Sequence, residues 1–311
     1  MSTWWTSPSS SNPRLTEPYP GRLGRPFFIS GDEMTKSPFH ESPVMPEMFD
    51  GEKPINFRCG KGISCFNACC KSADISLTPY DIVRLKKHLG ISSSEFLDRH
   101  TVPYEMEKDG LAGVKLKPAE GGTACPFVTE EGCSVYEDRP TACRYYPLAH
   151  LSMRKQDEYV DRSGYALVVE KHCLGHFEER EILVDDYRKE QDLEQYDEAS
   201  RGWRQLILKK KSSGPSIGNP SRRSLQLFFT ACYDIDRFRD FVYSDGFIML
   251  FDLPEEEYLG FEEDDKLLEF SYRFLRQVLF GENTIPLREE IADARRDRAL
   301  RRRSMDGMEE E

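Results

Sequence analysis

Eight of the nine cysteines in this chain lie between Cys59 and Cys173. Only Cys232 lies outside this stretch, within an apolar helical segment, and we interpret it as a buried, inert thiol. Eight cysteines at close spacing require a common cause, which is metal ligation or disulfide bonding. Thiolate is a soft anionic ligand that favours zinc, copper(I) or iron–sulfur clusters. The predicted metal ligands are Cys59, Cys65, Cys69, Cys70, Cys125, Cys133, Cys143 and Cys173.

Disulfide bonds explain these cysteines less well than a metal does. The start of the chain has no apolar run that would act as a secretory signal, so we expect a cytoplasmic protein. In a reducing cytosol, clustered cysteines are more often metal-binding or catalytic than cross-linked. A chain of 311 residues can also bury an ordinary core without covalent staples.

The spacing of the cysteines is compatible with two metal sites. In chain order it is Cys59-x5-Cys65-x3-Cys69-Cys70, then Cys125-x7-Cys133-x9-Cys143, then Cys173. In a helix the adjacent side chains of residues 69 and 70 would be rotated by about 100° from each other, and in a strand they would face opposite sides. We therefore expect two sites, or one ligand beside one packed thiol. Eight thiolates suffice for two four-cysteine zinc sites, two iron–sulfur clusters, or one of each.

The residues around the cysteines resemble a known family. The matching segments are Phe57–Cys59, Cys65–Cys70, Cys125–Phe127 and Cys133–Pro147, and the last contains Cys-x-Val-Tyr-Glu-x-Arg-Pro-x-x-Cys-Arg. They are similar to the YkgJ-type cysteine-cluster proteins, which are described as zinc- or iron-chelating. The resemblance covers residues 55–176. The first cysteine group is spaced more widely here than in the compact CxxCxxCC form.

The resemblance leaves three functions open. They are metal chelation, with an iron–sulfur cluster slightly ahead of zinc, a redox or electron-transfer role, and methylation of a protein substrate. The third is implied because the family includes flagellin lysine N-methylases, linked to an iron–sulfur cluster and S-adenosylmethionine. The residues themselves do not support an enzyme. There is no glycine-rich adenosyl-cofactor fingerprint, and Ser72 stands where a Cys-x3-Cys-x2-Cys motif beginning at Cys65 needs its third cysteine.

Two arginines beside the cysteines are predicted to bind the cofactor. Arg139 and Arg144 would donate N–H groups to cluster sulfurs or offset the negative charge of several thiolates. The alternative is that both form ordinary salt bridges with Glu137 and Asp138.

The bulk composition excludes some partners. The net charge of −12 opposes non-specific attraction to nucleic acid or anionic lipid. No stretch approaches the roughly 18 apolar residues of a membrane helix, since the longest apolar run is Phe247–Phe251. We expect no membrane or nucleic-acid partner, and a protein substrate or partner stays open.

The elements that must position the cysteines predict an α+β fold. A small, irregular, metal-stapled module precedes a mostly helical C-terminal part. Thr78 to Asp81 has the pattern of a helix start, and Gly90 ends that helix. Ser92 with Glu95 three residues later predicts the next helix.

In the rest of the chain, apolar residues first alternate with polar ones, as in strands, and later recur with a helical period. Strands are expected at 114–117 and 165–169, and a hairpin over 125–136 carries two cysteines. One long helix is expected over 178–211, and a buried helix over 267–281.

These elements predict four parts. They are an extended Pro- and Ser-rich arm at 1–54, the cysteine-cluster domain at 55–176, a helical region at 177–281 with a linker near 209–223, and a charged tail at 282–311.

Overall fold

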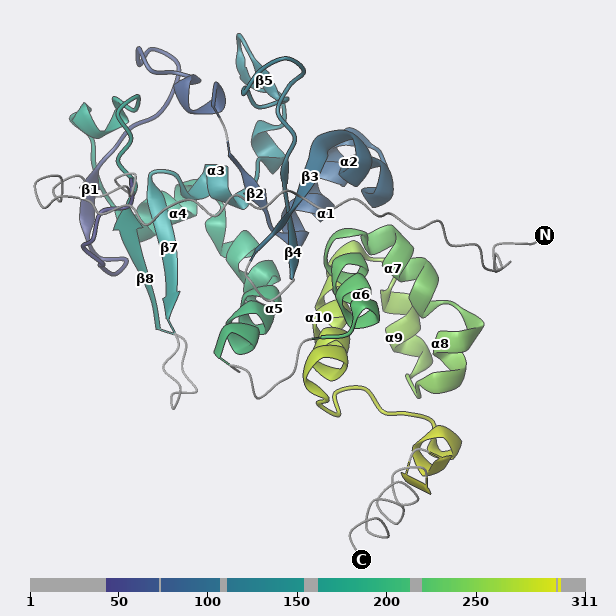
Figure 1. Ribbon diagram of the computed structural model, residues 1–311. Helices are drawn as coiled ribbons and strands as arrows, with labels where there is room; N and C mark the ends of the chain where they lie inside the picture. Colours follow the sequence, from purple (N-terminus) through teal and green to yellow (C-terminus); the bar gives the residue numbers. More distant parts are fainter. Residues whose placement is uncertain are drawn as a thin grey trace, which may run out of the picture. The chain divides into compact units, whose positions relative to one another are not determined.

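The computed structural model describes residues 43–72, 74–106, 111–153, 162–212, 220–294 and 296–297. Residues 43–311 form one compact unit. Its described part is a mixed α+β structure with a helical C-terminal part, which confirms the predicted fold class. Figure 1 gives the elements and their order along the chain.

The β structure consists of small antiparallel sheets. The pairings are β1 (Pro54–Asn56) with β9 (Glu181–Leu183), β4 (Ala112–Leu116) with both β2 (Ser76–Leu77) and β3 (Thr101–Glu105), β5 (Val128–Thr129) with β6 (Gly132–Cys133), and β7 (Leu148–Met153) with β8 (Arg162–Leu167). Sheets of this size are not stable alone, so they depend on the helices and loops packed against them.

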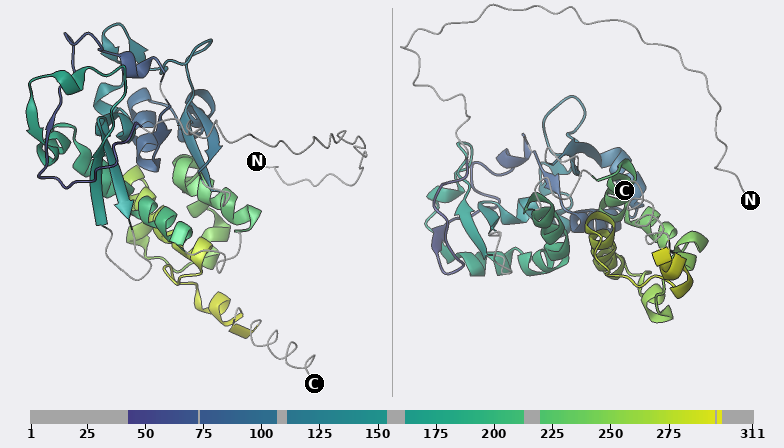
Figure 2. Two further views of the ribbon diagram at one scale, coloured as in Figure 1. Left: turned by 60° about the vertical axis from the view of Figure 1, so that its left-hand side comes forward. Right: turned by 60° about the horizontal axis from the view of Figure 1, so that its bottom comes forward.

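The helices divide into those within the cysteine region and those after it. The first are α1 (Pro79–Leu89), α2 (Ser93–His100) and α3 (Thr141–Tyr145), with 3₁₀ turns η1 (Ala68–Cys70), η2 (Tyr136–Asp138) and η3 (Gly175–Phe177). The later ones are α4 (Val184–Glu190), α5 (Leu193–Ser212), α6 (Arg222–Tyr233), α7 (Ile235–Val242), α8 (Asp245–Leu250), α9 (Glu255–Gly260) and α10 (Asp264–Phe280). Both views of Figure 2 show α6 to α10, drawn in green to yellow, gathered together. Among the described residues, no helix is long and apolar enough to cross a bilayer.

The predicted helix boundaries around α1 and α2 are confirmed. The Thr78 hydroxyl accepts the N–H of Asp81 at 3.2 Å, and the Asp81 carboxylate accepts the N–H of Thr78 at 2.8 Å. Gly90 ends α1 with φ 65°, a conformation that favours glycine. Ser92 starts α2 by accepting the N–H of Glu95 at 3.1 Å.

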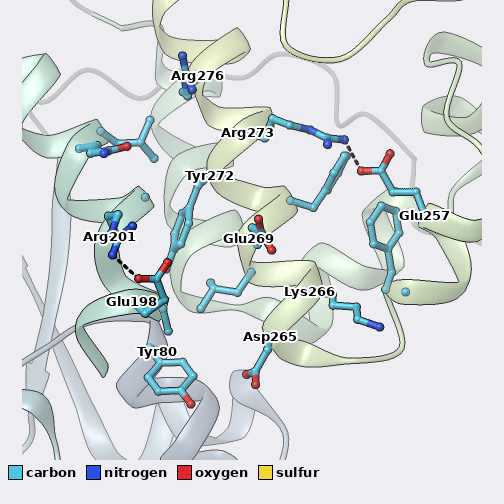
Figure 3. A pocket seen from close by; sticks show the side chains of 18 of the residues that line it. Tyr80, Glu198, Arg201, Glu257, Asp265, Lys266, Glu269, Tyr272, Arg273 and Arg276 are labelled. Carbon is cyan, nitrogen blue, oxygen red and sulfur yellow. Dashed lines mark hydrogen bonds and ion pairs between the residues drawn. The ribbon is translucent and has the colours of Figure 1, made fainter. Parts of the chain in front are cut away.

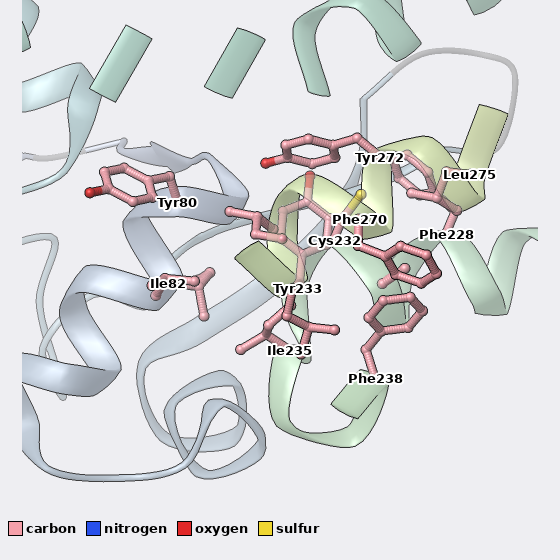
Figure 4. Close-up of a cluster of buried hydrophobic side chains, with 14 of the residues drawn as sticks. Tyr80, Ile82, Phe228, Cys232, Tyr233, Ile235, Phe238, Phe270, Tyr272 and Leu275 are labelled. Carbon is pink, nitrogen blue, oxygen red and sulfur yellow. The ribbon is translucent and has the colours of Figure 1, made fainter. Parts of the chain in front are cut away.

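One hydrophobic core joins the cysteine region to the C-terminal helices. Buried side chains of α1, α2 and β4 lie in the same cluster as those of α6, α7 and α10. Figure 4 shows Cys232 in this core near Tyr233, Phe270 and Tyr272. Cys232 is 1% exposed, so the prediction that it is buried is confirmed.

A charge network reinforces the same contact. The ammonium group of Lys86 in α1 lies 2.6 Å from Asp236 of α7 and 2.9 Å from Asp264 of α10. Arg239 pairs with both of these carboxylates. Because every charge in the network has a partner, the network can be partly buried without a large desolvation penalty.

The prediction of one long helix over 178–211 is wrong in two places. Residues 181–183 form β9, because Ile182 pairs with Ile55 of β1 in an antiparallel sheet. The chain then breaks between α4 and α5, where Asp192 adopts φ 52°. Strand β9 and the break at Asp192 depend on distant contacts or backbone geometry, which cannot be predicted from helical periodicity.

The ends of the predicted parts are more ordered than the sequence suggests. Helix α5 continues to Ser212, so helix replaces the start of the linker expected from residue 209. Ile285, at the start of the predicted tail, is fully buried. Phe49, in the predicted arm, exchanges backbone hydrogen bonds of 2.8 and 2.9 Å with Tyr165 of β8. Parts of the predicted arm, linker and charged tail lie outside the described residues: 1–42, 213–219, 295 and 298–311.

Candidate metal centre

The eight clustered cysteines lie on loops and short elements. Cys59 and Cys65 precede η1, Cys69 and Cys70 lie in it, Cys125 precedes β5, Cys133 lies in β6, Cys143 lies in α3 and Cys173 precedes η3. Figure 1 shows the β5 hairpin and the loop between β1 and β2 at the same upper edge of the drawing. All eight are free thiols.

Hydrogen bonds between these loops bring their cysteines together. The N–H of Cys125 donates to the carbonyl oxygen of Cys70 at 2.7 Å. The N–H of Leu174, which follows Cys173, donates to the Sγ of Cys65 at 3.2 Å. Segments far apart in the sequence are therefore joined at or next to their cysteines.

Two residues with positive φ angles lie where the η1 loop meets the β5–β6 hairpin. Asn67 has φ 64°, which asparagine tolerates better than most residues, and its side chain donates to the carbonyl of Thr129 at 3.1 Å. Gly132 has φ 125°, and an added Cβ would lie 3.3 Å from the ring of Phe66. The β5–β6 hairpin is thus fastened directly to the η1 loop.

The side chains of Cys69 and Cys70 do not point apart. Their sulfur atoms are 3.9 Å from each other, which is a direct contact. The expectation from backbone direction alone is wrong, because rotation about the Cα–Cβ bonds turns both thiols to the same place. In this pair, a hydrogen bond from Cys70 lowers the pKa of Cys69 to about 7, and retention of the shared proton raises the pKa of Cys70.

The thiols also destabilise one another's ionised forms. Loss of solvation, followed by the charges of Cys69, Cys173 and Cys65, raises the pKa of Cys59 to about 11, although its side chain still contacts solvent. Burial raises the pKa of Cys143 in the same way, with Cys125 as the strongest neighbouring charge. A bound cation would remove this mutual repulsion between thiolates.

The donor set fits a soft metal, but no closed coordination shell is present. In the described part of the chain, no group of three or more cysteine, histidine, aspartate or glutamate side chains is placed so that it could hold an ion. The thiols converge from separate loops and are free, which matches the chemistry that zinc and iron–sulfur clusters need. Closing a shell would require rotation of side chains on short loops.

Arg144 contacts the backbone rather than sulfur. It is 2% exposed, and its guanidinium donates to the carbonyl oxygens of Arg139 at 3.1 Å, Gln191 at 2.8 Å and Glu137 at 2.5 Å. The same group lies 4.2 Å over the ring of Tyr196. These contacts fasten the segment before α3 to the start of α5, and the predicted role of Arg144 at a cofactor stays a prediction.

The guanidinium of Arg139 donates to the carbonyl oxygen of Tyr136 at 2.8 Å and to Oε1 of Gln191 at 2.5 Å. Burial raises the pKa of Cys133, and the positive charge of Arg139 partly offsets this rise. The salt bridge with Asp138 that the sequence offers as an alternative does not form, because Asp138 pairs with Arg84 at 2.5 Å and with His88 at 2.8 Å.

Asp81 has a second role that the sequence does not reveal. Its fully buried carboxylate caps α1 and also accepts the N–H and hydroxyl of Thr141 at 2.8 and 2.7 Å. Thr141 begins α3, the helix that carries Cys143. Burial raises the pKa of Asp81 despite these hydrogen bonds. The capping pattern alone could not predict a partner 60 positions away.

A separate cleft lies between α5, α9 and α10 (Figure 3), with a volume of about 1190 Å³. The side chain of Tyr272 crosses it and is 6% exposed, and its hydroxyl has no hydrogen-bond partner. Gly202 permits this approach, since an added Cβ would lie 2.5 Å from the Tyr272 ring. Arg273 and Glu257 form an ion pair across the cleft wall. None of the residues that line the cleft is a cysteine.

Residues 58–173 match the sequence model of the CxxCxxCC family, described as "Putative zinc- or iron-chelating domain". The matched range contains all eight clustered cysteines and ends before α4. The match confirms the predicted family and supports metal binding by these cysteines. No curated protein and no solved structure matches the chain.

Proposed function

We propose that this protein binds an iron–sulfur cluster or zinc through the clustered thiols, and we place iron–sulfur ahead of zinc. The observation that carries the proposal is the convergence of eight free thiols from separate loops within the region that matches a chelating family. The preference for iron rests on the resemblance to lysine N-methylases, because thiolates alone suit both metals.

Each neighbouring residue has a defined part in this proposal. The thiols hold the metal, and Arg139 offsets their negative charge near Cys133. Asp81 positions α3 and with it Cys143. When bound, zinc would cross-link the loops, and an iron–sulfur cluster would also store an electron.

Metal content and colour test the proposal. The full-length protein is purified without oxygen, and zinc, iron and acid-labile sulfide are measured per chain together with the visible spectrum. We expect a brown protein with iron and sulfide in matching amounts. A colourless protein with stoichiometric zinc would assign zinc instead, and a folded protein free of both metals would refute metal binding.

Two further activities remain as alternatives from the resemblance. A redox role requires that the centre accept and release an electron reversibly, which voltammetry measures. Methylation of a protein lysine requires S-adenosylmethionine, so binding of that cofactor to the anaerobic protein is the first test. The cleft of Figure 3 has no feature that selects either activity.

A further inference from the structure

We propose that the cleft between α5, α9 and α10 binds an extended, arginine-rich peptide segment of a partner protein. The volume of the cleft is about 1190 Å³. Most small-molecule pockets have volumes of roughly 300–1,000 Å³, so a cleft of this size suits a longer ligand such as a peptide. None of the described residues that line it is a cysteine, so this binding would not depend on the metal.

The charges along the cleft favour a cationic ligand over an anionic one. Every lysine and arginine of the described lining already has a carboxylate partner. The pairs are Arg201–Glu198, Lys209–Glu282, Lys266–Glu263, Arg273–Glu257 and Arg276–Glu282. An anion would have to break one of these ion pairs before it could bind, whereas a cation would not.

Three carboxylates of the lining have no ion-pair partner in the part of the chain that the structure describes. They are Glu256 of α9 and Asp265 and Glu269 of α10. Asp265 and Glu269 are four residues apart, so they lie on the same side of α10 and repel each other. A guanidinium between them would remove this repulsion, and its planar set of donors can bind carboxylates through two N–H groups at once.

A buried hydroxyl in the same cleft is a second and independent indication of a ligand. Tyr272 is 6% exposed, and its hydroxyl has no hydrogen-bond partner among the described residues. Figures 3 and 4 both show this oxygen pointing toward Tyr80, which also lines the cleft. Buried polar groups in native proteins are rarely left without a partner, so the hydroxyl calls for one.

The neighbouring Arg273 indicates that the ligand carries acceptors as well as positive charge. Its Nε atom is buried and has no partner in the described structure, and a guanidinium N–H can only donate. The carbonyl groups of a peptide accept hydrogen bonds, whereas the ammonium groups of a polyamine do not. A basic peptide therefore fits this lining better than a small organic cation.

Binding of defined peptides to the full-length protein tests the proposal. The probe is a fluorescein-labelled octapeptide of alternating arginine and alanine, compared with the glutamate–alanine octapeptide and with spermine, and fluorescence anisotropy measures the affinity. We expect only the arginine peptide to bind, and its affinity should fall as salt is added, because exposed charges are screened. Displacement of the arginine peptide by an equal concentration of spermine would overturn the assignment to a peptide.

Substitutions locate the bound peptide. Asp265→Asn/Glu269→Gln should weaken binding about tenfold. Asp98→Asn/Asp240→Asn is the matched control, because it removes the same charge from exposed positions outside the cleft, and it should not change the affinity. Tyr272→Phe should weaken binding about fivefold through loss of a hydrogen bond. Circular dichroism shows whether each variant folds.

Three results would overturn the proposal. Equal losses in the two double variants would mean non-specific attraction to a chain of net charge −12. Unchanged binding in Tyr272→Phe would place the peptide outside the cleft. Binding that appears only after residues 295–311 are removed would assign the cleft to the chain's own arginines at 295–303 instead of a partner protein.

Discussion

At the residue scale, Arg144 is the largest fully buried side chain in the described structure. A buried charge is tolerated only when its hydrogen-bonding groups are satisfied, and here backbone carbonyls satisfy them. Lysine cannot reproduce this planar arrangement of donors.

We therefore predict that Arg144→Lys lowers the free energy of unfolding by about 2–3 kcal/mol, because buried carbonyls lose their donors. The matched control is Arg180→Lys, since Arg180 forms a half-exposed ion pair with Glu190. It should cost less than about 1 kcal/mol. Urea unfolding of the two variants measures the difference, and equal costs would contradict the bracing role of Arg144.

Cys232 is the thiol that should have no part in metal binding. It is buried in the core of α6 and α10, and burial raises its pKa well above the usual value. Cys232→Ser should leave the metal content unchanged and cost about 1 kcal/mol or slightly more, because a hydroxyl enters an apolar site. The matched substitution Cys143→Ser should lower the metal content. Metal analysis with urea unfolding checks both, and metal loss from Cys232→Ser would contradict the assignment.

At the scale of elements, Asp138 ties η2 to α1. Partial burial raises its pKa, but hydrogen bonds from His88 and Arg84 outweigh this effect and hold the pKa below its usual value. The folded state therefore binds this proton less tightly than the unfolded chain does. The stabilisation is present above the ordinary aspartate pKa of about 3.9 and is lost as the pH falls through the lower folded value.

We predict that Asp138→Asn costs about 1 kcal/mol near neutral pH and that this cost shrinks below about pH 4. Asp186→Asn provides the control, because the Asp186–Lys189 pair is largely exposed. Its cost should stay below about 0.5 kcal/mol at all pH values. Chemical unfolding from pH 3 to pH 7 tests this, and a cost for Asp138→Asn that does not change with pH would argue against the ion pairs.

At the scale of the whole molecule, residues 43–311 form one unit, and the larger of two hydrophobic clusters spans part of the cysteine region and the C-terminal helices. The charge network around Lys86 crosses the same boundary. Loss of metal from the cysteine loops should consequently lower the stability of the helical part as well.

The start of this unit at Pro43 indicates where the chain can be shortened. A chain beginning at Pro43 should keep the full metal content and melting temperature, because the residues before it contain no thiol. A chain beginning at Glu52 should bind the same metal but melt at a lower temperature, since it lacks the Phe49–Tyr165 hydrogen bonds. Thermal melting and metal analysis of both chains test this, and equal melting temperatures would show that residues 43–51 add no stability.

The sequence by itself determined the features whose causes are local. The cap at Thr78, the stop at Gly90 and the apolar period of α10 each arise within a few residues, so they can be predicted without a fold. The spacing of the cysteines and the motif from Cys133 to Pro147 likewise identify the family.

Only the tertiary structure decided the features whose causes are distant. The strand β9 exists because Ile55 supplies a partner far earlier in the chain. Asp81 reaches α3, and Arg144 reaches the start of α5, through contacts that no local pattern encodes. The grouping of the thiols has the same origin, because loops with little regular structure take their positions from hydrogen bonds to other loops.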